Sequence, residues 1–212
     1  MIKMNLEKLA DWPSAQVIKR LIFFSIILYA IQFPIMVYYW ALSTFPTNFY
    51  VHQLSFSGPY YKSLLKSMSA EQINYYRIAI ILDDFYALSY GIFYFSIVLY
   101  LGRKYEEVSG WRKSGYLVAI LGVIAAICDN IENGFILLML TDPRGFPDIW
   151  AITHSYFALI KIIFIWTCIV WIIIADINLY IKKIHNFKPF LVVLISLLTM
   201  PFIIIYTLIA WP

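Results

Sequence analysis

The chain has 212 residues, of which 62% are hydrophobic and only 13% charged. A soluble domain carries about 25% charged residues, so this chain has too few polar groups to cover an ordinary water-exposed surface. The net charge of +4 is small and its basic residues are spread over short segments, which argues against a DNA- or RNA-binding protein and in favour of a membrane protein.

Five apolar stretches are long enough for a helix of about 20 residues to cross the hydrocarbon core. They cover residues 20–42, 78–101, 115–140, 149–180 and 189–211. Pro34 in the first stretch and Pro201 in the last predict bends. The first stretch exceeds the apolar part of a cleaved signal peptide, which is about 7–15 residues long. The sequence therefore predicts one all-α domain, residues 1–212, folded as a polytopic transmembrane helical bundle of the cell membrane.

The segment 43–77 is the only sizeable piece predicted to lie outside the membrane. It opens with turn-forming residues, and Ser69 followed by Gln72 three positions later has the spacing of a capping box. This pattern predicts a helix that begins after Ser69 and continues into the second apolar stretch.

The distribution of Lys and Arg predicts the orientation in the membrane. Eleven of the 16 Lys and Arg residues fall on the side of the N-terminus and four on the other, with Lys161 inside the fourth stretch. Because basic residues accumulate on the cytoplasmic side, we expect a cytoplasmic N-terminus and an external C-terminus.

Charged and amide side chains interrupt the second, third and fourth stretches, where a charge costs about 2.5–3.5 kcal/mol on insertion scales. These residues are Asp83, Asp84, Asp129, Asn130, Glu132, Asn133, His154 and Lys161. With a rise of about 1.5 Å per residue, they fall about 8 to 17 Å below the outer ends of their helices. The common depth predicts a single polar site in the outer half of the membrane.

Helical spacing brings several of these groups onto shared faces. Asp129, Glu132 and Asn133 share one face of the third stretch, so we expect Lys161 to pair with Asp129 or Glu132. We take Asp129, Glu132 and Lys161 as the candidate catalytic residues. The candidate ligand-binding residues are Asp83, Asp84, Tyr86, Tyr90, Asn133, His154 and Gln32.

The balance of charge suggests what this site holds. Four carboxylates (Asp83, Asp84, Asp129 and Glu132) share one buried cation, Lys161, with Arg77 a further candidate partner of Asp84. At least one carboxylate is therefore expected to be protonated, or to bind a cation or a cationic ligand.

Structural interpretations of the same residues stay open. Asp83 and Asp84 could lie at headgroup level near Arg77, and Asp129, Glu132 and Lys161 could form an ion pair that only joins helices. His154 could be an interfacial ring, and the tyrosines could serve packing. Cys128 and Cys168 are predicted to be buried thiols. No nucleophile, nucleotide-binding or metal-binding motif is found, so no metal or cofactor is predicted.

The run DDFYALSYGIFY at 83–94, the motif D-x-x-E-N at 129–133 and Lys161 in the next stretch resemble a family of small bacterial membrane proteins. The resemblance covers about residues 52–175 and implies kinship without an activity. In layout, the Pro-containing first stretch and the later inward carboxylates resemble the sterol isomerase and sigma-2 receptor superfamily. That family's catalytic His and Glu do not align with residues of this chain, so this second resemblance implies architecture only.

Three functional hypotheses follow. The first is a protein that binds or chemically processes a small lipidic or amine-bearing ligand, with membrane lipid around it and no nucleic acid. The second is a proton- or cation-coupled transporter that uses the same residues as a relay. The third is an accessory subunit or immunity-type protein whose polar cluster is structural. The identity of any protein partner is left open.

Overall fold

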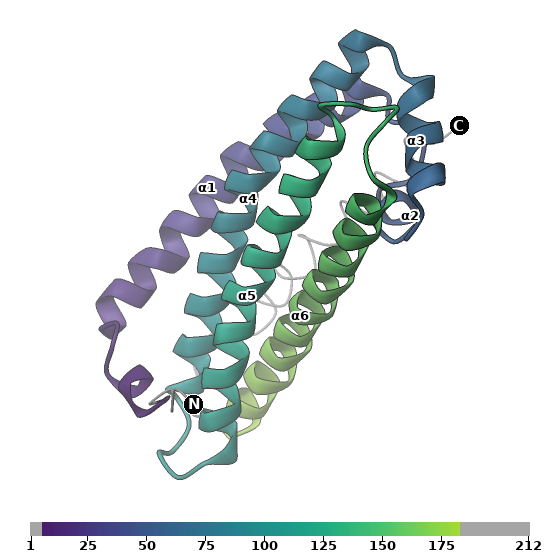
Figure 1. Ribbon diagram of the computed structural model, residues 1–212. Coiled ribbons are helices and arrows are strands. Elements are labelled where there is room, and N and C mark those ends of the chain that lie inside the picture. The colour runs from purple at the N-terminus through teal and green to yellow at the C-terminus, as the bar shows by residue number, and fades with distance from the viewer. Residues whose placement is uncertain (1–5, 183–212) are drawn as a thin grey trace.

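The computed structural model describes residues 6–182 of the chain, and within this range it contains helices and no strand. A short 3₁₀ helix, Leu6–Ala10, precedes α1. The α-helices are α1 (Ala15–Ser43), α2 (Phe49–Gln53), α3 (Gly58–Ser67), α4 (Ala70–Gly102), α5 (Gly110–Met139) and α6 (Asp148–Ile181). Figure 1 shows the four long helices running along the length of the molecule.

Four of these helices, α1, α4, α5 and α6, are long and apolar enough to cross a membrane. They correspond to the first four predicted stretches, which confirms the all-α class and a long apolar helix at four of the five predicted stretches. The predicted fifth crossing at 189–211, with the bend at Pro201, lies outside the described residues. Helix α1 continues through Pro34 as one helix, so this proline does not end it.

Helix α4 begins well before its apolar stretch, because the predicted capping box is present. The Ser69 hydroxyl accepts from the Gln72 backbone N–H at 3.2 Å, and the Gln72 carbonyl oxygen Oε1 accepts from the Ser69 N–H at 2.7 Å. The amide nitrogen of Gln72 also donates to the Thr44 hydroxyl at the end of α1. One side chain therefore starts α4 and ties it to α1.

The long helices pack as neighbours in the order α1, α4, α5, α6, and α4 also contacts α6 (Figure 1). Glycines bring α4 and α5 close together: a Cβ added at Gly122 would lie 2.8 Å from the Cβ of Tyr94, and one at Gly91 would lie 2.6 Å from the Cβ of Ala126. This close approach of α4 and α5 keeps facing side chains within contact distance.

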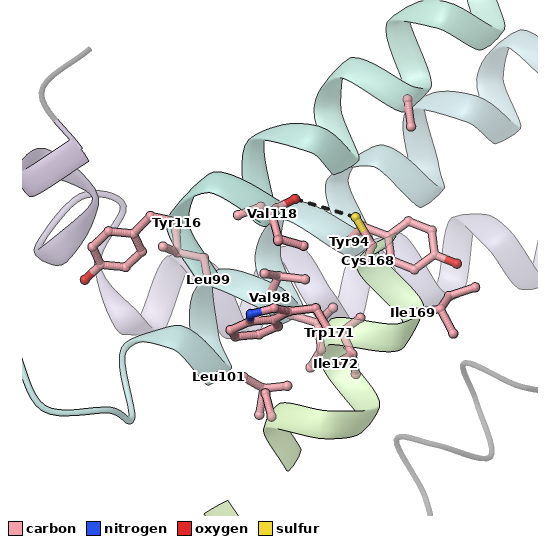
Figure 2. Close-up of a cluster of buried hydrophobic side chains, with 14 of the residues drawn as sticks. Tyr94, Val98, Leu99, Leu101, Tyr116, Val118, Cys168, Ile169, Trp171 and Ile172 are labelled. Atoms are coloured by element: carbon pink, nitrogen blue, oxygen red, sulfur yellow. Dashed lines mark hydrogen bonds between the residues drawn. The ribbon is translucent and has the colours of Figure 1, made fainter. Parts of the chain in front are cut away.

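One half of the bundle has an apolar interior, drawn in Figure 2. Tyr94 and Val98 of α4 pack there with Tyr116 of α5 and Trp171 of α6. The Cys168 thiol points to the Val118 carbonyl at 3.5 Å. Cys128 and Cys168 are both buried free thiols, as predicted.

Residues 44–69, which connect α1 to α4 and include α2 and α3, are called the cap. Figure 1 shows α2 and α3 beside the end of the bundle where α6 begins. Phe45 and Tyr61 of the cap pack with Tyr76 of α4 in a second buried cluster, and the hydroxyls of Tyr61 and Tyr76 lie 2.7 Å apart. The predicted external segment is thus a folded cover rather than an extended loop.

Candidate functional site

A lysine held between two carboxylates forms the centre of the candidate site. The Lys161 ammonium of α6 lies 2.7 Å from Oδ1 of Asp129 and 2.6 Å from Oε2 of Glu132, both on α5. All three residues are buried, with exposed fractions of 5%, 3% and 0% in the order Lys161, Asp129, Glu132. The structure therefore brings the three candidate catalytic residues together, because positions 129 and 132 are three residues apart on one helix face.

The second oxygen of each carboxylate has a hydrogen-bond donor of its own. The Tyr90 hydroxyl of α4 donates to Oδ2 of Asp129 at 2.7 Å. The side-chain amide of Gln53, at the end of α2, donates to Oε1 of Glu132 at 2.7 Å. Donors from α2, α4 and α6 thus fix the orientation of two carboxylates on α5.

A second acidic pair lies beside this centre. The Asn133 amide donates to Oδ2 of Asp83 and to Oδ1 of Asp84, each at 3.1 Å. Asp83 is buried and Asp84 partly so. Among residues 6–182, no Lys or Arg lies within 4.0 Å of either carboxylate. Arg77, a predicted partner of Asp84, instead donates to the Leu140 carbonyl at 3.0 Å.

His154 lies between the cap and the charged centre. It is fully buried, its Nδ1 is 3.7 Å from Oε1 of Glu132, and its ring stacks on that of His52 with centroids 6.1 Å apart. The cap covers His154, so its ring has no exposed surface. Burial, reinforced by the positive charge of Lys161, lowers the pKa of His52 to about 3, so this ring is neutral.

Two of the predicted ligand-binding residues lie apart from the centre. Gln32 accepts a hydrogen bond at 2.6 Å from the Ser89 hydroxyl, at the contact of α1 with α4. The Tyr86 ring packs against Tyr29 and Phe33 of α1, with centroids 5.2 and 5.9 Å away, and its edge meets Tyr90 at 5.6 Å. The Tyr90 hydroxyl therefore links this aromatic row to Asp129.

Sequence reasoning missed Gln53 and His52. Both lie on α2, a helix of five residues whose first turn is capped by the Asn48 side chain, which accepts from the Tyr50 N–H at 3.0 Å. A hydropathy profile does not detect a helix of only five residues. The available signal was the adjacent His-Gln pair between Val51 and Leu54, since two polar side chains in an apolar setting need partners.

The charged centre occupies only one half of the bundle. Helix α5 has no Asp, Glu, Lys, Arg or His between Lys113 and Asp129, and α6 has none between Lys161 and Asp176. The apolar cluster of Figure 2 fills that interval. Within residues 6–182, the ionisable side chains of α5 and α6 therefore gather toward the two ends of these helices, with no charged side chain between Lys113 and Asp129 or between Lys161 and Asp176.

The fold and the site define a helical bundle with four helices able to cross a membrane and a buried acid–amine cluster near one end. Comparisons with protein families, with curated proteins and with solved structures found no match to this chain.

Proposed function

We propose that this chain is a multi-pass protein of the cell membrane that binds, or chemically processes, a small lipidic or amine-bearing ligand at its buried polar cluster. The observation that supports this most directly is the arrangement of Lys161 between Asp129 and Glu132, with further acids beside it. One ammonium balances one of the two carboxylates, and Asp83 and Asp84 add more negative charge.

An excess of negative charge in a low-dielectric interior favours uptake of a proton or a cation. Within the described residues 6–182, the side-chain donor to the Asp83–Asp84 pair is the neutral Asn133 amide. A ligand ammonium bound at the cluster would offset this excess of negative charge far better than an amide does. The alkyl part of such a ligand would lie against apolar helix surfaces, which is why we infer a lipidic amine rather than a water-soluble one.

If the protein also catalyses a reaction, Asp129 or Glu132 is the proton carrier. Lys161 touches both carboxylates, so it remains an ammonium and acts as an electrostatic partner rather than as a nucleophile. Coupled acids with different hydrogen-bond environments are a common basis for proton transfer.

The same arrangement gives less support to coupled transport. A relay across the membrane needs ionisable groups or water along its whole length. The described parts of α4, α5 and α6 place charged groups near the cap end and near the opposite end, with the apolar cluster between them. A polar cluster confined to one half of the bundle suits binding or catalysis better.

We further propose five crossings, with 189–211 as the fifth, a cytoplasmic N-terminus and an external cap. The excess of basic residues at the N-terminal end supports this orientation.

The binding proposal is tested with dodecylamine as probe and dodecanol as a neutral control of equal chain length, on purified protein in lipid nanodiscs. At a probe concentration of about 100 Kd, specific binding stabilises the folded state by about 2.7 kcal/mol, which raises the midpoint of thermal unfolding by several degrees. We expect this shift with dodecylamine only, and we expect Asp129→Asn and Glu132→Gln to abolish it.

Glu71→Gln is the matched control, because Glu71 is an exposed residue in the first turn of α4. This variant should respond to dodecylamine like the wild type. Equal responses in the wild type, Asp129→Asn and Glu132→Gln would reject the site. A cluster that is purely structural would instead lower the unfolding midpoint in both cluster variants and show no amine-specific shift in any of the proteins.

A further inference from the structure

The cap meets the charged centre through a neutral side chain that a ligand could replace. Oε2 of Glu132 faces Lys161, whereas Oε1 accepts from the Gln53 amide at 2.7 Å. Gln53 is 2% exposed and comes from the connection between α1 and α4, not from the bundle itself. Of the groups around Glu132, it is therefore the donor that can leave without unfolding a long helix.

The cap closes over α5 and α6 through a small number of polar contacts. Besides Gln53, the Phe56 N–H donates to the Ser155 hydroxyl at 3.1 Å, and Lys62 pairs with Asp148 at the start of α6 at 2.7 Å. Phe56 is held in the left-handed backbone region (φ 49°), which is unfavourable for a residue with a side chain.

The base of the cap, by contrast, is anchored. The Gln72 side chain joins its two ends by bridging Thr44 and Ser69. Aromatic contacts of Trp40 with Phe45, and of Phe45 with Tyr76, hold its root to α1 and α4. The cap is thus joined to α1 and α4 at its base. It is held to α5 and α6 by the polar contacts above and by apolar packing of Tyr61 and Leu65 with Ile136 and Ala151 in the second buried cluster.

From this arrangement we propose that the cap is a gate over the polar site, latched by Lys62–Asp148 and Phe56–Ser155, with Gln53 occupying the place on Glu132 that a ligand's donor takes when the gate opens. This inference rests on the proposed binding site and adds the route and the residue that the ligand displaces. Because Glu132 and His154 are fully buried when the cap is closed, access from the aqueous surface at this end requires the latch to open.

The test uses a reporter cysteine under the cap and needs no ligand. Ser155 is fully buried, and Ser155→Cys exchanges one oxygen for sulfur. Because this change alters the acceptor of the Phe56 N–H, all rates are compared within the Ser155→Cys background, where they report on the Lys62–Asp148 contact. Its rate of reaction with N-ethylmaleimide, followed by peptide mass spectrometry, measures opening of the cap. The native Cys128 and Cys168 lie on other peptides and are buried.

Lys62→Glu in this background places two acids against each other and should raise the reaction rate about three- to tenfold. The charge-reversed pair Lys62→Glu/Asp148→Lys should return the rate toward that of Ser155→Cys alone, in which Lys62 and Asp148 still pair. Lys66→Glu is the matched control, since Lys66 is an exposed residue of the same helix and makes no ion pair among the described residues. It should leave the rate unchanged.

An unchanged rate in Lys62→Glu, or an equal increase in Lys66→Glu, would overturn the gate. If Ser155→Cys does not fold, Gln53→Cys serves as the reporter with the same variants and the same expectations. Because the assay contains no amine, its outcome is independent of the dodecylamine measurement, so failure of the gate and failure of the binding site are told apart.

Discussion

At the scale of single residues, the site depends on a buried ammonium group, that of Lys161. Lys161 and its two carboxylates are removed from water, which is costly unless their hydrogen bonds are complete. Here Tyr90 and Gln53 donate hydrogen bonds to the two carboxylates, so each charge has a partner of opposite sign or a hydrogen-bond donor. Removing one member leaves the others buried without compensation.

Lys161→Met tests this dependence. Met has a similar length and no charge, so Asp129 and Glu132 would be left as neighbouring buried acids. We expect the free energy of unfolding to fall by about 3–5 kcal/mol, measured by denaturation in mixed micelles. Lys66→Met, at an exposed position, should change it by less than about 0.5 kcal/mol. A loss below about 1 kcal/mol for Lys161→Met would contradict a tightly coupled cluster.

His52 predicts how stability depends on pH. Its pKa is about 3 in the folded protein and about 6.5 when unfolded, so the unfolded chain binds more protons between these values. The contribution of His52 to the free energy of unfolding is therefore fully present above about pH 6.5. It is lost as the pH falls, by up to about 1.4 kcal/mol per pH unit. His52→Phe should remove this share of the loss between pH 7 and pH 5 in thermal unfolding. The same pH dependence in the variant would show that His52 is not the group responsible.

The sequence predicted that Lys161 pairs with Asp129 or Glu132 from two simple rules, helical spacing and depth from the helix ends, and in the structure it contacts both. It did not predict Gln53, because a contact across 79 residues depends on how the cap folds back. It also did not predict that Gln32 lies apart from the cluster of Lys161 and its two carboxylates. Gln32 has the right depth, but helix order decides that α1 faces Ser89 of α4 rather than Lys161.

At the scale of helices, hydropathy located the four helices that are long and apolar enough to cross a membrane, and it placed most of their ends short of the observed helix ends. Helix α4 starts at Ala70, eight residues before the apolar stretch, since its first turns are defined by the Ser69 capping box and not by apolar residues. The neighbours of each helix could not be predicted, because helix order in a membrane is decided by close side-chain packing rather than by hydropathy.

Two glycines of α5 test this packing. A Cβ at Gly122 would lie 2.8 Å from the Cβ of Tyr94 and 3.2 Å from the Phe95 nitrogen, whereas one at Gly134 would meet nothing within 4 Å. Gly122→Ala should therefore lower the free energy of unfolding by about 1–3 kcal/mol. Gly134→Ala should leave it unchanged or raise it by up to about 1 kcal/mol, because Ala favours helix. Equal effects of the two changes on the unfolding midpoint would contradict the close contact of α4 and α5.

At the scale of the whole molecule, the bundle is divided along its length. Polar groups and the cap gather at one end, and the apolar cluster of Figure 2 fills the other half. This division makes the orientation in the membrane important, since it determines which compartment the cap faces.

Cysteine labelling in intact cells tests the orientation. Glu106→Cys lies in the exposed connection of α4 to α5, and Asp142→Cys in the exposed connection of α5 to α6. With an external cap, a membrane-impermeant maleimide should label position 142 in intact cells and position 106 only after permeabilisation. The reverse pattern would place the cap on the cytoplasmic side.

Native mass spectrometry of the purified protein with dodecylamine tests most directly whether the acid–amine cluster is a binding site. We expect a one-to-one complex in the wild type and in Glu71→Gln, none with dodecanol, and none in Asp129→Asn or Glu132→Gln that remain folded. A complex of equal occupancy in all four proteins, or none in any of them, would contradict a ligand site at Lys161, Asp129 and Glu132.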